Sequence, residues 1–94
     1  MLLNSKKKST FVVLNEKGLH ARPATELVKC ASQFKSSITL HYKGYSVDAK
    51  SLLGILMMAA TKGAKILIDA EGEDAAQCTE SLIHLAKNKF YMNY

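Results

Sequence analysis

Residues 38–49 read Ile38-Thr39-Leu40-His41-Tyr42-Lys43-Gly44-Tyr45-Ser46-Val47-Asp48-Ala49, and this stretch decides how the rest of the chain can fold. Apolar and polar side chains alternate on both sides of a central Lys-Gly pair. Alternation with a period of two is typical of a strand that buries one face, and a Gly-containing pair between two such runs is typical of a tight turn. The stretch therefore predicts a β-hairpin, and with it antiparallel pairing.

Before the hairpin, the sequence predicts a strand and then a helix. Residues 10–14 are β-branched and apolar, and the Asn-Glu-Lys-Gly run at 15–18 has turn chemistry. From Pro23 to Phe34, apolar residues recur at helical spacing, and Pro is tolerated in a first turn because its missing N–H has no helical partner there. His20 is therefore expected at or just before a helix N-terminus.

After the hairpin, the sequence predicts a second helix, a fourth strand and a third helix. Ser51 is placed to cap a short helix over residues 52–61, which Gly63 can end in the left-handed conformation. Residues 66–70 alternate as a strand, and Asp74 with Gln77 resembles a capping box. The residues of the last helix expected to face the core are Cys78, Leu82, Leu85 and Ala86.

The predicted order is β-α-β-β-α-β-α in a chain of 94 residues, which has room for one core. We expect an α+β fold, a two-layer open-faced sandwich with a four-stranded antiparallel sheet and three helices on one face. The predicted domain covers residues 9–94. Residues 1–8 are expected to be a basic N-terminal extension, with Lys6, Lys7 and Lys8 in a disordered lead-in.

Bulk composition narrows the functional classes. The longest mostly apolar run, residues 52–60, is much shorter than the roughly 20 residues of a membrane span, so a cytoplasmic protein without membrane insertion is expected. Cys30 and Cys78 have no metal-ligand spacing and are expected to be buried free thiols, and no metal or cofactor is predicted. The formal charge of +5 favours an acidic partner surface or, less specifically, nucleic acid.

The segment Gly18-Leu19-His20-Ala21-Arg22-Pro23-Ala24 carries the candidate chemistry. A neutral imidazole is a usable nucleophile, and the unpaired N–H groups of a helix N-terminus stabilise an arriving phosphate. Arg22 adds a forked donor that suits phosphate oxygens. The plain alternative is that His20 and Arg22 are only polar residues in a loop before a helix.

This segment resembles the active-site motif of HPr, the histidine-containing phosphocarrier family of the phosphoenolpyruvate-dependent sugar phosphotransferase system. A second family motif matches at residues 50–56, Lys-Ser-Leu-Leu-Gly-Ile-Leu, and its Ser51 follows His20 by 31 positions as the family pattern requires. With the element order, the resemblance extends over about residues 9–90.

The resemblance implies that His20 accepts a phosphoryl group from phosphorylated Enzyme I, through its Nδ1, and passes it to an enzyme IIA. Arg22 would help to hold this phosphate, and Ser51 is the position that an HPr kinase/phosphorylase modifies in many relatives. The protein would be a monomer and a co-substrate without turnover of its own. The positions that align with the family's exposed docking patch are Leu19, Leu52, Leu53 and Leu56. The alternative role for these leucines is packing in the core. The alternative role for Ser51 is capping of the helix that follows it.

Three other functions remain open at this stage. Within the family, the chain can belong to the nitrogen-type branch or be a purely regulatory homologue. A small basic nucleic-acid-binding domain would explain the charge, although specific nucleic-acid recognition is not expected because no pair of aromatic residues is predicted on the outer strand face. A free-standing enzyme is disfavoured because no second acid, base or metal cluster accompanies His20.

Overall fold

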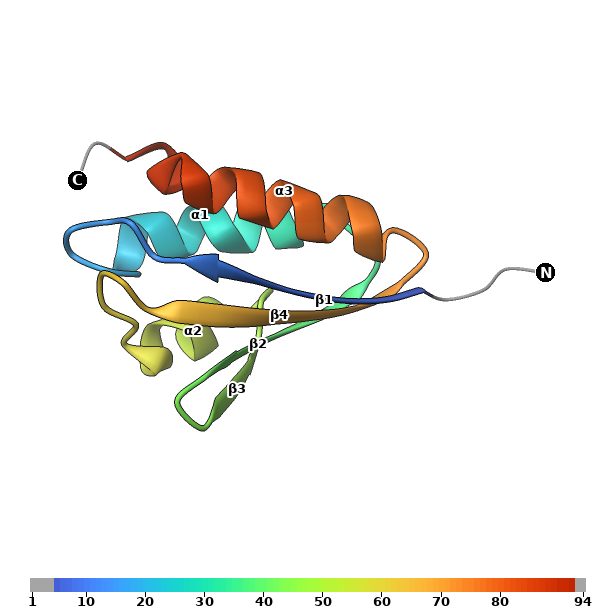
Figure 1. Cartoon of the computed structure of the whole chain (residues 1–94), viewed down its shortest axis with the longest axis horizontal. Helices are drawn as coiled ribbons and strands as arrows, with labels where there is room; N and C mark the ends of the chain where they lie inside the picture. Colours follow the sequence, from blue (N-terminus) through green and yellow to red (C-terminus); the bar gives the residue numbers. More distant parts are fainter. Residues whose placement is uncertain (1–4, 93–94) are drawn as a thin grey trace.

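The computed structural model of the chain describes residues 5–92 (Figure 1). Its strands are β1 (Ser5–Val12), β2 (Ser37–Tyr42), β3 (Tyr45–Asp48) and β4 (Lys65–Gly72), and its helices are α1 (Ala21–Ala31), α2 (Leu52–Met58) and α3 (Ala75–Lys87), followed by a short 3₁₀ turn (Lys89–Tyr91). The strands form one antiparallel sheet in the order β1-β4-β2-β3. Helices α1 and α3 lie side by side over this sheet, which confirms the predicted open-faced sandwich (Figure 1).

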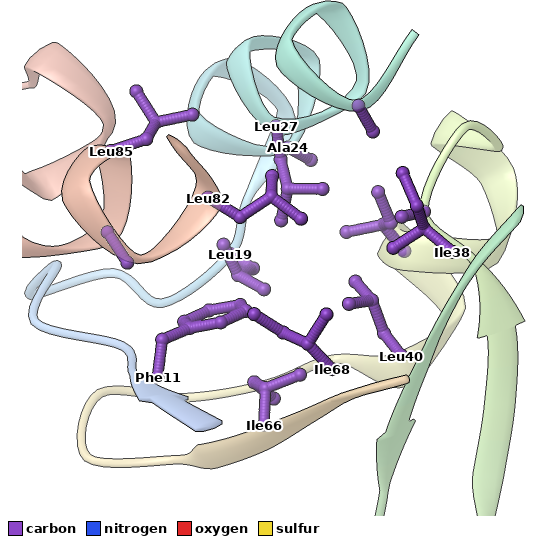
Figure 2. Close-up of a cluster of buried hydrophobic side chains, with 14 of the residues drawn as sticks. Phe11, Leu19, Ala24, Leu27, Ile38, Leu40, Ile66, Ile68, Leu82 and Leu85 are labelled. Atoms are coloured by element: carbon purple, nitrogen blue, oxygen red, sulfur yellow. The ribbon is translucent and has the colours of Figure 1, made fainter. Parts of the chain in front are cut away.

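Alternation along the strands separates a core face from an open face. Ile38 and Leu40 of β2, with Ile66 and Ile68 of β4, are almost completely buried and point toward the helices (Figure 2). Leu82 of α3 faces them from the other layer. The hairpin was predicted from the same alternation, and its register places Leu40 opposite Val47.

The prediction of a disordered lead-in at residues 6–8 is wrong for the described residues. Strand β1 begins at Ser5, and the register with β4 places Lys6 opposite Glu71 and Lys8 opposite Asp69. Opposite charges on directly facing positions stabilise a strand pair by about 0.2–1 kcal/mol. The lysines therefore have a structural role in β1, while residues 1–4 of the expected extension lie outside the described range.

Helix α2 is shorter than expected, because Ala59 and not Gly63 ends it. Ala59 adopts the left-handed conformation (φ 50°), and its N–H donates to the Leu56 carbonyl oxygen. The chain then leaves the helix, so that the carbonyl oxygen of Ala60 can accept the N–H of Leu19 at 2.9 Å. The residue that follows the helix end is thus bonded to the distant loop that carries His20.

The expected capping box at the start of α3 is also wrong. The Asp74 carboxylate makes no capping bond to its own helix. It accepts the backbone N–H groups of Lys35 and Ser36, each at 2.9 Å, and the Ser36 hydroxyl at 2.5 Å. Asp74 therefore joins the start of α3 to the loop that enters β2.

Candidate functional site: the His20 loop and the start of α2

His20 occupies the N-cap position of α1, as the sequence predicts. Its backbone is extended (φ −77°, ψ −172°), and its carbonyl oxygen accepts the N–H of Ala24 at 3.0 Å, which opens the helix. The residue is half-buried, and its Nε2 atom is buried. Of the two ring nitrogens, Nε2 is therefore shielded from a reacting group, which makes Nδ1 the candidate acceptor.

The electrostatic setting at the start of α1 suits an anion. Backbone N–H groups in the first turn of a helix point outward with the positive end of the helix dipole behind them. No acidic side chain lies in this first turn to oppose a negative charge. Arg22 is exposed at the same end of the helix, two positions after His20, and its guanidinium has the forked donor geometry that suits an oxyanion.

Long-range contacts hold the loop that carries His20. Gly18 has φ +69°, and a Cβ atom at this position would overlap the carbonyl oxygen of Ala60. The neighbouring N–H of Leu19 donates to that same oxygen at 2.9 Å. On the other side, the buried Asn15 side chain donates to the Lys89 carbonyl oxygen at 2.9 Å. The loop is thus fastened to the end of α2 and to the C-terminal turn.

Ser51 is the N-cap of α2, which confirms its predicted capping position. Its Oγ accepts the N–H of Gly54 at 3.1 Å. The four exposed apolar side chains that follow it form what we call the α2 patch: Leu52, Leu53, Leu56 and Met57, with 39%, 69%, 37% and 59% of their surface exposed. On the opposite side of this short helix, Ile55 and Met58 are buried.

The structure corrects the expected patch at two residues. Leu19 was expected on the exposed surface, but it is 3% exposed and lies in the core between Phe11 and Leu82 (Figure 2). Its backbone bond to Ala60 turns its side chain inward. Met57 was missed, although its spacing of four from Leu53 places both on one stripe of a helix.

The two cysteines and the remaining histidine on α3 lie outside the candidate site. Burial raises the pKa of the fully buried Cys78 thiol to about 12 and also raises the pKa of Cys30, which is only half-buried and so less enclosed than expected. His84 is exposed on α3. Within residues 5–92, no three or more His, Cys, Asp or Glu side chains are grouped so as to hold a metal ion, and no helix is long and apolar enough to cross a membrane.

The family model for the PTS HPr component phosphorylation site matches residues 7–88. The chain belongs to the HPr family. The match covers both the His20 loop and the start of α2, so the resemblance drawn from the two motifs is confirmed.

Solved HPr structures support the same assignment. HPr from Thermoanaerobacter tengcongensis has 35% sequence identity and a TM-score of 0.88, with 94% of this chain and 99% of that one covered. HPr from Bacillus anthracis has 35% identity and a TM-score of 0.81, with coverage of 85% and 95%. Crh, the catabolite repression HPr of Bacillus subtilis, has 32% identity and a TM-score of 0.63, with coverage of 85% and 95%.

Proposed function

We propose that this HPr-family chain accepts a phosphoryl group on Nδ1 of His20 from phosphorylated Enzyme I and passes it to an enzyme IIA. The observation that carries the proposal is the position of His20 at the N-cap of α1 with Nε2 buried. In each transfer the bond between phosphorus and the donor atom breaks, and a bond between phosphorus and the acceptor atom forms. The protein is then a cytoplasmic, monomeric co-substrate.

The surroundings of His20 suit a phosphoryl group that binds there and can then be passed on. The N–H groups at the start of α1 and the guanidinium of Arg22 offset part of the phosphate charge. The groove of about 1050 Å³ between α1 and α3 is lined by residues that include Cys30 and His84 but neither His20 nor Arg22. A reacting histidine outside this groove suits transfer between two protein surfaces.

Phosphorylation with phosphoenolpyruvate and Enzyme I, followed by intact-protein mass spectrometry, tests the proposal. The wild-type chain should gain one phosphoryl group that is lost in mild acid, and His20→Ala should gain none. His84→Ala is the matched control, because His84 is an exposed histidine on α3. An unmodified wild type, or label that persists in His20→Ala, would refute the assignment of the acceptor.

We further propose that an HPr kinase/phosphorylase modifies Ser51. Its Oγ lies at the start of α2, beside the exposed side chains of the α2 patch, so a phosphate there would place about two negative charges in the surface that partners approach. Incubation with ATP and the kinase should add an acid-stable phosphate. Ser51→Asn retains a capping side chain and removes the hydroxyl, so a phosphate still present in this variant would contradict the assignment.

The regulatory alternative is favoured by the likeness to Crh. The assays with Enzyme I and with the kinase distinguish it from the phosphocarrier function. A purely regulatory homologue should take phosphate at Ser51 and none from Enzyme I at His20. The nucleic-acid alternative loses support, because Lys6 and Lys8 face acidic residues of β4 across the sheet. Specific nucleic-acid binding is therefore not part of the proposal.

A further inference from the structure

Three polar side chains form a connected row on the open face of the sheet: Ser46 of β3, His41 of β2 and Asp69 of β4. Nδ1 of His41 lies 2.9 Å from Oγ of Ser46, and Nε2 of His41 lies 3.7 Å from Oδ2 of Asp69. In the register His41 is directly opposite Ser46, while Asp69 is opposite Thr39, two positions along the same face. The row lies on the side of the sheet turned away from the core, since Ile38 and Leu40 point the other way.

The carboxylate of Asp69 lies 3.7 Å from Nε2 of His41, on the opposite side of the ring from Ser46, and so favours one tautomer. An ionised carboxylate can only accept a hydrogen bond, so the favoured tautomer is the one whose Nε2 carries the proton and directs it toward Asp69. In that tautomer Nδ1 presents a lone pair, so the hydroxyl of Ser46, 2.9 Å away, is the donor of this bond. The charged groups on facing elements are Lys8 of β1, opposite Asp69, and Asp48 of β3, opposite Thr39.

We propose that Ser46 is an acylation site for small activated acyl donors, such as acyl phosphates and activated esters. His41 acts as the general base, and Asp69 is a positioning residue that orients the imidazole. The order hydroxyl, imidazole, carboxylate is the one that activates serine in hydrolases of unrelated folds. Ser46 is exposed and His41 is 35% exposed, so a small donor can reach the hydroxyl from solvent.

The reaction balances without a further co-reactant. Oγ of Ser46 attacks the carbonyl carbon of the donor, and a bond forms between these two atoms. The bond from the carbonyl carbon to the leaving group breaks, and phosphate or phenolate departs with the electron pair. The hydroxyl proton passes to Nδ1 of His41 and then to solvent, and nothing is oxidised or reduced.

The test uses the full chain with p-nitrophenyl acetate, follows release of p-nitrophenolate and locates the acetyl group by peptide mass spectrometry. Ser37 is the internal control, because it is an exposed serine at the other end of β2 from His41. We expect Ser46 to be acetylated about tenfold faster than Ser37, less than the roughly 100- to 10,000-fold that a base supplies in an enclosed active site. Ser46→Ala should lose this adduct.

Variants of the other two residues separate chemistry from structure. His41→Gln should lower acetylation of Ser46 to the rate of Ser37. Asp69→Asn should give an intermediate rate, and Asp69→Glu should restore it. Far-UV circular dichroism and the urea midpoint show that each variant is folded, independently of any phosphoryl transfer. An unlabelled Ser46, an equal rate in His41→Gln or an acetyl group found only on His41 would overturn the proposal.

Discussion

Replacement of Gly18 by Ala tests whether the contact between the His20 loop and α2 builds the site. Gly18 has φ +69°, and an added Cβ would overlap the carbonyl oxygen of Ala60, the acceptor of the Leu19 N–H. Gly44 is the matched control, because it also has a positive φ (+85°) but nothing lies within 4 Å of an added Cβ.

The two substitutions differ in cost for reasons that can be separated. A left-handed conformation costs an L-residue about 1–2 kcal/mol, and this is the whole cost expected for Gly44→Ala. Gly18→Ala must in addition move the backbone away from Ala60 and weaken a hydrogen bond worth about 0.5–1.5 kcal/mol. We therefore expect Gly18→Ala to lower the free energy of unfolding by about 1.5–3.5 kcal/mol, the sum of these two contributions.

Urea unfolding and the rate of phosphorylation by Enzyme I measure the two consequences. Gly18→Ala should unfold at lower urea and, because His20 follows two positions later, should also be phosphorylated more slowly. Gly44→Ala should retain the wild-type rate. Equal destabilisation by the two substitutions, or a normal phosphorylation rate in a destabilised Gly18→Ala, would show that the contact with Ala60 does not position His20.

Three further outcomes can be checked. Hydrogen bonds from Ser36 and the backbone hold the pKa of Asp74 below its ordinary value. The stabilising contribution of this carboxylate is therefore present at neutral pH and is lost as the pH falls through the folded-state pKa. Asp74→Ala should be less stable than the wild type at neutral pH, and its urea midpoint should fall less steeply than that of the wild type below about pH 4. Leu53→Ala should weaken binding of Enzyme I in calorimetry while changing stability by less than about 0.5 kcal/mol, whereas the buried Ile55→Ala should cost about 2–5 kcal/mol of stability. Phe90→Ala should cost about 3–5 kcal/mol in urea unfolding because its ring is fully buried; a loss below 1 kcal/mol would contradict the role of this residue as a core anchor.

The sequence was sufficient to predict those helices and strands that are determined by residues close together in the chain. The alternation around Lys43-Gly44 predicted the hairpin, and Pro23 with the apolar spacing after it predicted a helix that begins beside His20. Ser51 was recognised as an N-cap because such a residue bonds a backbone N–H only three positions away. In each case the interacting groups are neighbours in the sequence.

The predictions that failed depend on partners far away in the chain. Three consecutive lysines are typical of a solvated tail, and only the register with Glu71 and Asp69 shows why Lys6 and Lys8 belong to a strand. The C-terminal turn likewise places Phe90 edge-on against Phe11, with 6.0 Å between ring centroids. Nothing near Phe90 in the sequence predicts that packing.

The carbonyl oxygen of Ala60 links the two parts of the candidate site. It follows directly after the left-handed Ala59 that ends α2, and it accepts the N–H of Leu19, the residue directly before His20. The Leu19 side chain is buried, so the exposed apolar side chains of the expected patch all lie on α2. Under the proposed function, a partner that binds the α2 patch would be aligned with His20 through this backbone contact, and selection among partners would rest on that patch while the chemistry at His20 stays the same.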